Sequence, residues 1–191
     1  MKKKVEKELQ SLSMTHAQFG VRFDYPPDPE GFALFRGQTV RLNAAGLGTL
    51  EFLFSPNPGE NLRPLAKIAS GGELSRVMLA LKSILHKQDT VPVMVFDEVD
   101  TGIGGRVAET VGRKLKKVAQ GKQVFSITHL PQIAGMASAH FRVHKEVKGN
   151  RTYSTIRELA YADRVEEIAR MSGGEKITET TLRHAREMIR P

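Results

Sequence analysis

The chain contains no cysteine among its 191 residues, and this absence excludes disulfides, thiolate metal sites and cysteine nucleophiles together. No apolar run approaches the ~20 residues of a membrane-spanning helix, and no segment has the flanks of a signal peptide. Hydrophobic residues make up 40% and charged residues 26% of the chain, an ordinary globular composition that excludes collagen-like and wholly disordered classes. These absences predict a cytoplasmic protein without a membrane partner.

Basic residues outnumber acidic ones, and the surplus is concentrated in one segment. The formal net charge is +8, yet the stretch 106–157 alone holds eleven Lys and Arg against two acidic residues. The tail from Asp163 onward is balanced, six against six. A clustered surplus attracts phosphates through its field, so the segment predicts a polyanion partner. A solvated basic face is the alternative, because no interleaved aromatic residues accompany the charge.

The first 59 residues predict one helix followed by short β-strands. Val5, Leu9 and Leu12 are spaced four and three apart, which is the seam of a helix that can pair in a coiled coil. Alternating apolar residues and turns rich in Gly or Pro then predict strands; they lie at 19–23, 32–35, 39–42 and 49–54.

The remainder of the chain predicts an α/β arrangement. Two nearly continuous apolar runs, 91–96 and 123–128, are typical of strands buried on both faces of a parallel sheet. The amphipathic helix expected between them, Gly105–Ala119, makes a right-handed βαβ unit. Another amphipathic helix, Glu73–Lys87, precedes this unit. The prediction ends with a hairpin that turns at 148–150 and two helices, 162–171 and 178–189.

Ser70, Gly71, Gly72 and Glu73 stand where the first of these helices begins. A helix N-terminus offers free N–H groups and the positive end of the macrodipole. The two glycines would let a phosphate approach the backbone, and the Ser70 hydroxyl adds a donor, so the segment predicts an anion cradle. A plain helix cap is the alternative for the same residues.

Asp97 and Glu98 follow directly after the apolar run 91–96. In an open α/β sheet, ligands bind at the carboxyl ends of the strands. A carboxylate there can hold a hydrated Mg²⁺, and a neighbouring one can orient and deprotonate an attacking water. The alternative is a polar strand end that leads into a turn.

His129 follows the second predicted strand. It lies at the same sheet edge as Asp97 and Glu98 if the two strands are parallel. A neutral imidazole there can touch a γ-phosphate or the attacking water. We expect the other five histidines to be structural, since His86, His140 and His144 have no partner at metal-ligand spacing on the same predicted face.

Together these residues resemble the second half of an ABC-type ATPase head, in the family of RecN and the structural-maintenance-of-chromosomes (SMC) proteins. Residues 67–76 resemble its signature loop, 96–105 its Walker B motif and D-loop, and 128–134 its switch-histidine segment. The similarity extends to 55–59 and 168–175, and so over almost the whole chain. It implies a P-loop NTPase fold of the ABC-ATPase-like α/β class, whose C-terminal lobe residues 19–191 would form.

The resemblance implies a role for each candidate residue. Asp97 would organise Mg²⁺ through water, Glu98 would polarise the hydrolytic water, and His129 would sense the γ-phosphate of ATP. Other residues would act across a head dimer. The signature loop would close over the nucleotide of a second head; its residues are Ser70, Gly71, Gly72 and Glu73. The D-loop residues Thr101 and Gly102 would lie at the seam of the dimer. Gly104 departs from the Asp that many family members carry there.

The phosphate-binding Walker A loop is missing. No G-x-x-x-x-G-K-[ST] pattern occurs, and the only Gly-Lys pair, Gly121-Lys122, is followed by Gln123. The lysine and the backbone cradle that neutralise the nucleotide phosphates are therefore absent. The resemblance places them in an N-terminal lobe beyond a long coiled coil. It implies that residues 1–18 form the end of that coiled-coil helix. We expect the chain to be the C-terminal lobe of a larger protein, or a piece of one, that hydrolyses ATP only with the N-terminal lobe.

Three functions remain open from the sequence. The first is a RecN-type ATPase, nucleoid-associated and acting in DNA double-strand break repair and recombination, whose heads dimerise when ATP binds. The second is a related ATPase half, from another SMC-type protein or a transporter subunit. The third is a non-catalytic module that binds nucleic acid through the basic segment.

Overall fold

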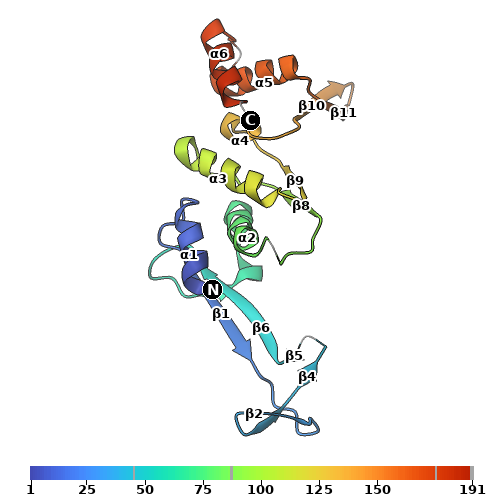
Figure 1. Ribbon diagram of the computed structural model, residues 1–191. Helices are drawn as coiled ribbons and strands as arrows, with labels where there is room; N and C mark the ends of the chain where they lie inside the picture. Colours follow the sequence, from blue (N-terminus) through green and yellow to red (C-terminus); the bar gives the residue numbers. More distant parts are fainter. Residues whose placement is uncertain (45, 87, 175, 190–191) are drawn as a thin grey trace. The chain divides into compact units, whose positions relative to one another are not determined.

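A computed structural model describes residues 1–44, 46–86, 88–174 and 176–189. The chain divides into two compact units, residues 1–80 and 81–191, and helix α2 (Gly71–Leu85) runs across the boundary (Figure 1). In the described ranges, no helix has both the length and the hydropathy required to cross a membrane.

Unit 1 consists mainly of β-strands. Strand β6 is the central strand of a three-stranded sheet and runs antiparallel to β1 and β7, while β2 pairs with β3 and β4 with β5. The elements before α2 are α1 (Lys2–Gln10), β1 (Gln18–Asp24), β2 (Ala33–Phe35), β3 (Gln38–Val40), β4 (Leu42–Asn43), β5 (Gly46–Leu47), β6 (Thr49–Ser55), β7 (Arg63–Pro64) and the short 3-10 helix η1 (Leu65–Lys67). The predicted β-rich portion is confirmed.

Helix α1 is shorter than the predicted coiled-coil stub, because it ends at Gln10 and not near residue 18. The Ser11 hydroxyl donates to the Glu8 carbonyl at 2.6 Å, and Ser13 has a positive φ of 65°. A serine side chain that bonds the local backbone and a left-handed residue both interrupt a helix. Gln18 already belongs to strand β1.

The apolar seam of α1 is used within unit 1. Val5, Leu9 and Leu12 are fully buried, and α1 packs against β1. The backbone N–H of Phe19 in β1 also donates to Glu6 Oε1 in α1 at 3.2 Å. The spacing therefore predicts the helix correctly at Val5 and Leu9, while Leu12 lies beyond its end. The element that packs against α1 in this unit is strand β1.

Unit 2 is built around the predicted βαβ unit, which the structure confirms. Strands β8 and β9 are parallel, with Val95 opposite Phe125, and β10 and β11 form the antiparallel hairpin. The elements after α2 are β8 (Val93–Phe96), α3 (Gly105–Val118), β9 (Gln123–Ser126), α4 (Pro131–Ala134), β10 (Phe141–Lys148), β11 (Arg151–Glu158), α5 (Tyr161–Gly173) and α6 (Glu179–Met188). Helix α4 was not predicted. Lys87 and Glu175, which the predictions above include, lie outside the described residues.

The expectation that both strands of the parallel sheet are buried on both faces is wrong. Val93 and Val95 are 45% and 64% exposed, whereas Met94 and Phe96, which point to the opposite face, are buried. A strand loses solvent on both faces only when a layer covers each of them. Helix α3 packs against β9 and supplies one layer, so the other face keeps its apolar side chains exposed.

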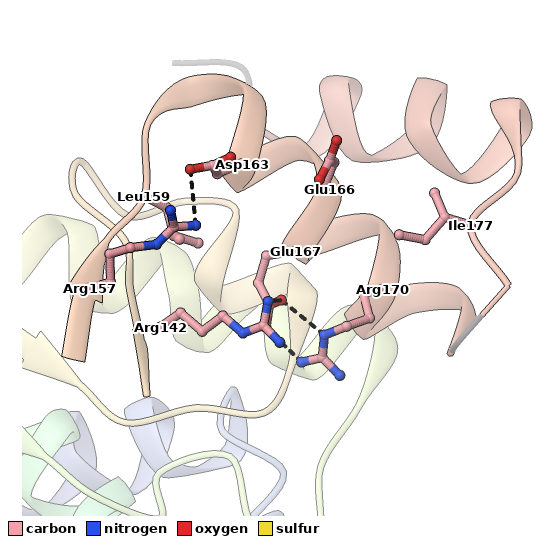
Figure 2. Close-up of a pocket in the computed structure, with 8 residues that line it drawn as sticks. All are labelled: Arg142, Arg157, Leu159, Asp163, Glu166, Glu167, Arg170 and Ile177. Carbon is pink, nitrogen blue, oxygen red and sulfur yellow. Dashed lines mark hydrogen bonds and ion pairs between the residues drawn. The ribbon is translucent and has the colours of Figure 1, made fainter. Parts of the chain in front are cut away.

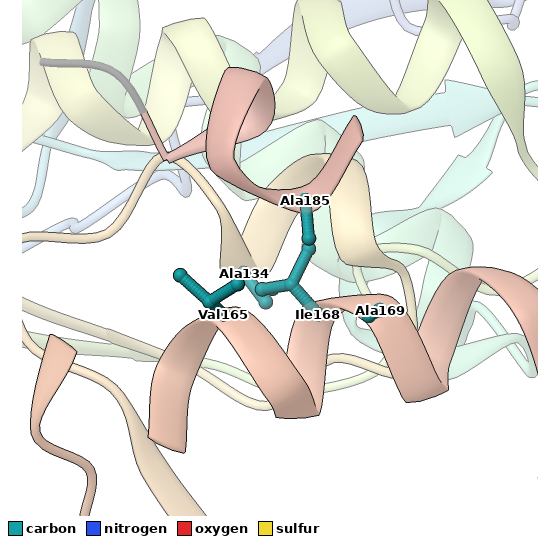
Figure 3. Close-up of a cluster of buried hydrophobic side chains, with 5 residues drawn as sticks. All are labelled: Ala134, Val165, Ile168, Ala169 and Ala185. Atoms are coloured by element: carbon teal, nitrogen blue, oxygen red, sulfur yellow. The ribbon is translucent and has the colours of Figure 1, made fainter. Parts of the chain in front are cut away.

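The C-terminal helices have their own small core. Ala134 from α4, Val165, Ile168 and Ala169 from α5, and Ala185 from α6 meet there (Figure 3). Ile168 is fully buried, a burial worth about 1.5–3 kcal/mol for a side chain of this size. This core fixes the helices that follow the His129 loop.

Candidate nucleotide-binding site

The ends of the two parallel strands bring three of the predicted residues to one edge. Phe96 and Ser126 pair at the ends of β8 and β9, and the Ile127 N–H donates to the Phe96 carbonyl at 2.9 Å. Asp97 and Glu98 therefore leave β8 at the edge where the chain leaves β9 toward His129. All three side chains are exposed, His129 by 72%. This edge is the place where α/β sheets bind ligands.

Asp100 joins the two loops at this edge, and sequence reasoning missed it. Its side chain is only 4% exposed. Its Oδ2 atom accepts the Thr128 hydroxyl at 2.6 Å and the His129 backbone N–H at 2.9 Å. The same oxygen lies 3.0 Å from Nδ1 of the His129 ring. The sequence offered one hint of this role, a third carboxylate three residues after Asp97. The partners of Asp100 lie 28 and 29 residues further along the chain, where no local pattern reveals them.

Glu98 sits in an unusual backbone conformation. Its φ is 57°, in the left-handed region that residues with a Cβ rarely adopt. The Thr101 N–H donates to the Glu98 carbonyl at 3.1 Å, and Gly102 follows with a φ of 72°, so these residues form a tight turn after β8. Such a backbone costs about 1–3 kcal/mol and persists where surrounding contacts impose it. Buried Val99, fully removed from solvent, provides such a contact.

Ser70 caps helix α2. Its Oγ accepts the Glu73 N–H at 3.3 Å, and its carbonyl accepts the Leu74 N–H at 3.1 Å. The helix begins at Gly71, two residues earlier than predicted, with Gly71 exposed and Gly72 buried. The cap interpretation is thus confirmed, but it leaves the hydroxyl proton of Ser70 available to an anion. These residues belong to unit 1, whereas Asp97, Glu98 and His129 belong to unit 2.

The donor set at the strand edge is compatible with Mg²⁺. Within the described residues, no group of three or more acidic or histidine side chains could hold a metal ion. Asp97 and Glu98 are the exposed carboxylates where β8 ends. Mg²⁺ in phosphoryl-transfer sites takes one or two carboxylates and fills its remaining positions with water and substrate phosphates. The residues present therefore fit an Mg²⁺ that shares its ligands with a nucleotide.

Comparison with solved structures defines the class of fold. The chain is similar to an Smc head domain with a coiled coil from Pyrococcus yayanosii, with a TM-score of 0.55 and 18% identity over 89% of this chain and 28% of that one. An Smc head domain from Pyrococcus furiosus gives a TM-score of 0.50 and 18% identity over 90% and 37% of the two chains. No family model matches the chain. The fold is that of an ABC-ATPase-like α/β lobe.

The chain is similar in sequence to RecN proteins. The chain is 45% identical over 188 residues to the DNA repair protein RecN of Bacillus subtilis, covering 97% of this chain and 33% of that protein. RecN of Streptomyces coelicolor is 43% identical over 185 residues and RecN of Vibrio cholerae 37% over 187, each covered to 32%. These matches correspond to a C-terminal fragment of RecN. It spans about a third of the length of the curated relatives it matches.

Proposed function

We propose that this chain supplies the Walker B carboxylates, the switch histidine and the signature loop of a RecN-type ATPase that acts in DNA double-strand break repair. The observation that carries the proposal is the strand edge of unit 2. There Asp97, Glu98 and His129 leave two parallel strands at the same end, and buried Asp100 joins their loops. Similarity to RecN over 97% of this chain supports the same assignment.

The side chains at this edge match the steps of ATP hydrolysis. Glu98 is exposed, and its carboxylate takes a proton from the water whose oxygen attacks the γ-phosphorus. The bond between that phosphorus and the bridging oxygen breaks, which yields ADP and inorganic phosphate. A bound Mg²⁺, held by Asp97, would supply charge neutralisation on the phosphates. General-base assistance of this kind is worth about 10²–10⁴-fold in rate.

His129 is the γ-phosphate sensor in this proposal. Its Nδ1 atom lies 3.0 Å from the Asp100 carboxylate, which orients the ring. Nε2 is then the ring atom left to contact a γ-phosphate oxygen. Since Asp100 also holds the backbone of this loop, the ring is positioned before nucleotide arrives, and little ordering is left for the moment of reaction.

The N-terminal lobe of the same protein is the first partner. Phosphoryl transfer requires a phosphate cradle and a lysine that this chain lacks. The exposed apolar face of the parallel sheet is the surface that such a lobe would cover, because parallel sheets are normally layered on both sides. Its side chains are Val91, Val93, Val95, Phe125 and Ile127.

A second head and DNA complete the set of partners. The capped N-terminus of α2, with Ser70 and Gly71 exposed, would close over a nucleotide bound to the second head, so that ATP drives head dimerisation. Hydrolysis would separate the heads again. This cycle would couple ATP turnover to the engagement of broken DNA.

The test is steady-state ATP turnover by the chain alone and by the chain mixed with the N-terminal lobe of its own protein. We expect negligible turnover from the chain alone and a gain of at least tenfold in the mixture. Val95→Lys should weaken this gain by placing a charge on the apolar sheet face. Tyr161→Lys, which changes another exposed apolar side chain in α5, is the matched control and should leave the gain intact. Robust hydrolysis by the chain alone would contradict the proposal.

A further inference from the structure

Helix α3 presents a basic face to solvent. Ala108, Val111, Leu115 and Val118 are buried on one side of this helix. The opposite side carries exposed cations at helical spacing; they are Arg106, Arg113, Lys116 and Lys117. Because the inner side is packed, the charged stripe is held on a rigid element.

Only some of these cations stabilise helix α3 itself. Lys116 and Lys117 lie in the last turn, where cations complement the negative end of the macrodipole. Arg106 lies in the first turn, where a cation opposes the dipole, and that turn has no acidic residue and no side-chain cap. The stripe has one ion pair, Arg113 with Glu109 at 3.5 Å. In the part of the chain that the structure describes, the side chains of Arg106, Lys116 and Lys117 have no ion pair.

The β10–β11 hairpin is the rival basic surface, and most of its charge is already matched. Arg142 pairs with Glu167 at 3.3 Å, Arg157 with Asp163 at 3.0 Å, and Lys148 with Glu146 at 3.0 Å. Figure 2 shows the first two arginines in a pocket of about 100 Å³, where Asp163 lies beside Arg157 and Glu167 beside Arg142 and Arg170.

Two hairpin cations without an ion pair among the described residues, Lys145 and Arg151, do not form a common surface. Strand residues alternate between the two faces of a sheet. Arg151 lies opposite Lys148 and shares its face, whereas Lys145 lies three residues before Lys148 and points to the other face. The hairpin therefore offers no row of unmatched charge comparable to that of α3.

We infer that the outward face of α3 binds the phosphate backbone of duplex DNA, an inference that rests on the proposed function and names the DNA-contacting surface of this lobe. Arg106 and Lys117 are separated by eleven residues, or about 16 Å along the helix axis. A DNA strand places one phosphate every ~3.4 Å along its axis, so the stripe spans several phosphates.

The composition of the stripe also selects the form of DNA. Helix α3 contains no aromatic residue, and single-stranded nucleic acid is bound largely by stacking bases on aromatic side chains. A row of cations without a stacking platform suits a duplex, whose phosphates lie outside and whose bases are already stacked. Binding through phosphates alone carries no sequence preference.

The experiment is a fluorescence anisotropy titration of a labelled duplex with the full 191-residue chain, without nucleotide and over a series of salt concentrations. The triple variant Arg106→Gln/Lys116→Gln/Lys117→Gln should bind at least tenfold more weakly than the unchanged chain. The slope of log K against log salt should become shallower by about two to three, one per lost phosphate contact. All three side chains are exposed, and far-UV circular dichroism verifies that the fold is kept.

The matched control removes three charges from the hairpin, Lys145→Gln/Lys148→Gln/Arg151→Gln, and should change the affinity by less than threefold. An equal loss in both variants, or none in the α3 variant, would overturn the inference. Tighter binding to a single-stranded oligonucleotide, or binding to phosphatidylglycerol vesicles but not to DNA, would overturn it as well. Because nucleotide is absent, these results stand apart from the ATPase test, and either proposal can fail without the other.

Discussion

One oxygen of Asp100 accepts the His129 backbone N–H at 2.9 Å and lies 3.0 Å from Nδ1 of the same histidine. It accepts the Thr128 hydroxyl as well, at 2.6 Å. A single buried side chain in the loop after β8 thus orients both the backbone and the ring of the loop after β9. Asp100 therefore ties the loop after β8 to the loop after β9.

Asp100→Ala should lower the free energy of unfolding by about 1–3 kcal/mol, because it leaves the Thr128 hydroxyl and the His129 N–H without their acceptor. Asp100→Asn keeps an acceptor oxygen and should cost less. Urea denaturation of both variants measures the difference. Equal stability of the unchanged chain and the alanine variant would show that Asp100 does not hold the His129 loop.

The backbone conformation of Glu98 predicts that a glycine at this position stabilises the fold. Its φ of 57° is unfavourable for a residue with a Cβ and open to glycine. Glu98→Gly should therefore raise the free energy of unfolding by up to about 1 kcal/mol, while Glu98→Ala, which keeps the Cβ, should not. Thermal melts of the two variants make a matched pair. A glycine variant no more stable than the alanine variant would mean that the turn is unstrained.

Local patterns predicted the βαβ unit but not the environment of its strands. The apolar run before Asp97 and the periodicity of Val111, Leu115 and Val118 depend only on neighbouring residues, and both elements formed as expected. The exposure of Val95 depends on which layer covers the sheet, and periodicity says nothing about that layer. The early end of α1 depends in the same way on one left-handed serine, Ser13.

The strand edge itself could be predicted, but the residue that organises it could not. Asp97, Glu98 and His129 were recognisable because each follows an apolar run directly or closely. Asp100 looks like another acidic turn residue in the sequence. Its burial follows from a pairing with Thr128 across 28 positions, and such distant pairings leave no local pattern.

Glu167 makes the stability of unit 2 dependent on pH. Its carboxylate is nearly buried, and Arg170 donates to it from Nε at 2.9 Å and from Nη2 at 2.6 Å. Hydrogen bonding from Arg170 holds the pKa of Glu167 below its ordinary value. A lowered folded-state pKa stabilises the fold above the unfolded-state pKa, and this contribution is lost as the pH falls through the folded-state pKa.

Glu167→Gln should therefore be less stable than the unchanged chain at pH 7, by about 1–3 kcal/mol, and the deficit should shrink as the pH falls below about 4. Urea denaturation at pH 7, 5, 4 and 3 measures it. Glu166→Gln, at the exposed neighbouring position, is the control and should change stability by less than about 0.5 kcal/mol. A Glu167→Gln deficit that is constant with pH would refute this account.

The central claim is that the edge of the parallel sheet performs ATP hydrolysis once the N-terminal lobe is present. Its most direct test is single-turnover ATP hydrolysis by the complete protein carrying Glu98→Gln, with nucleotide binding measured in parallel. We predict that hydrolysis slows by about 10²-fold or more, that ATP binding is retained, and that ATP-bound dimers accumulate. Hydrolysis at the rate of the unchanged protein would contradict the claim and remove Glu98 from the role of base.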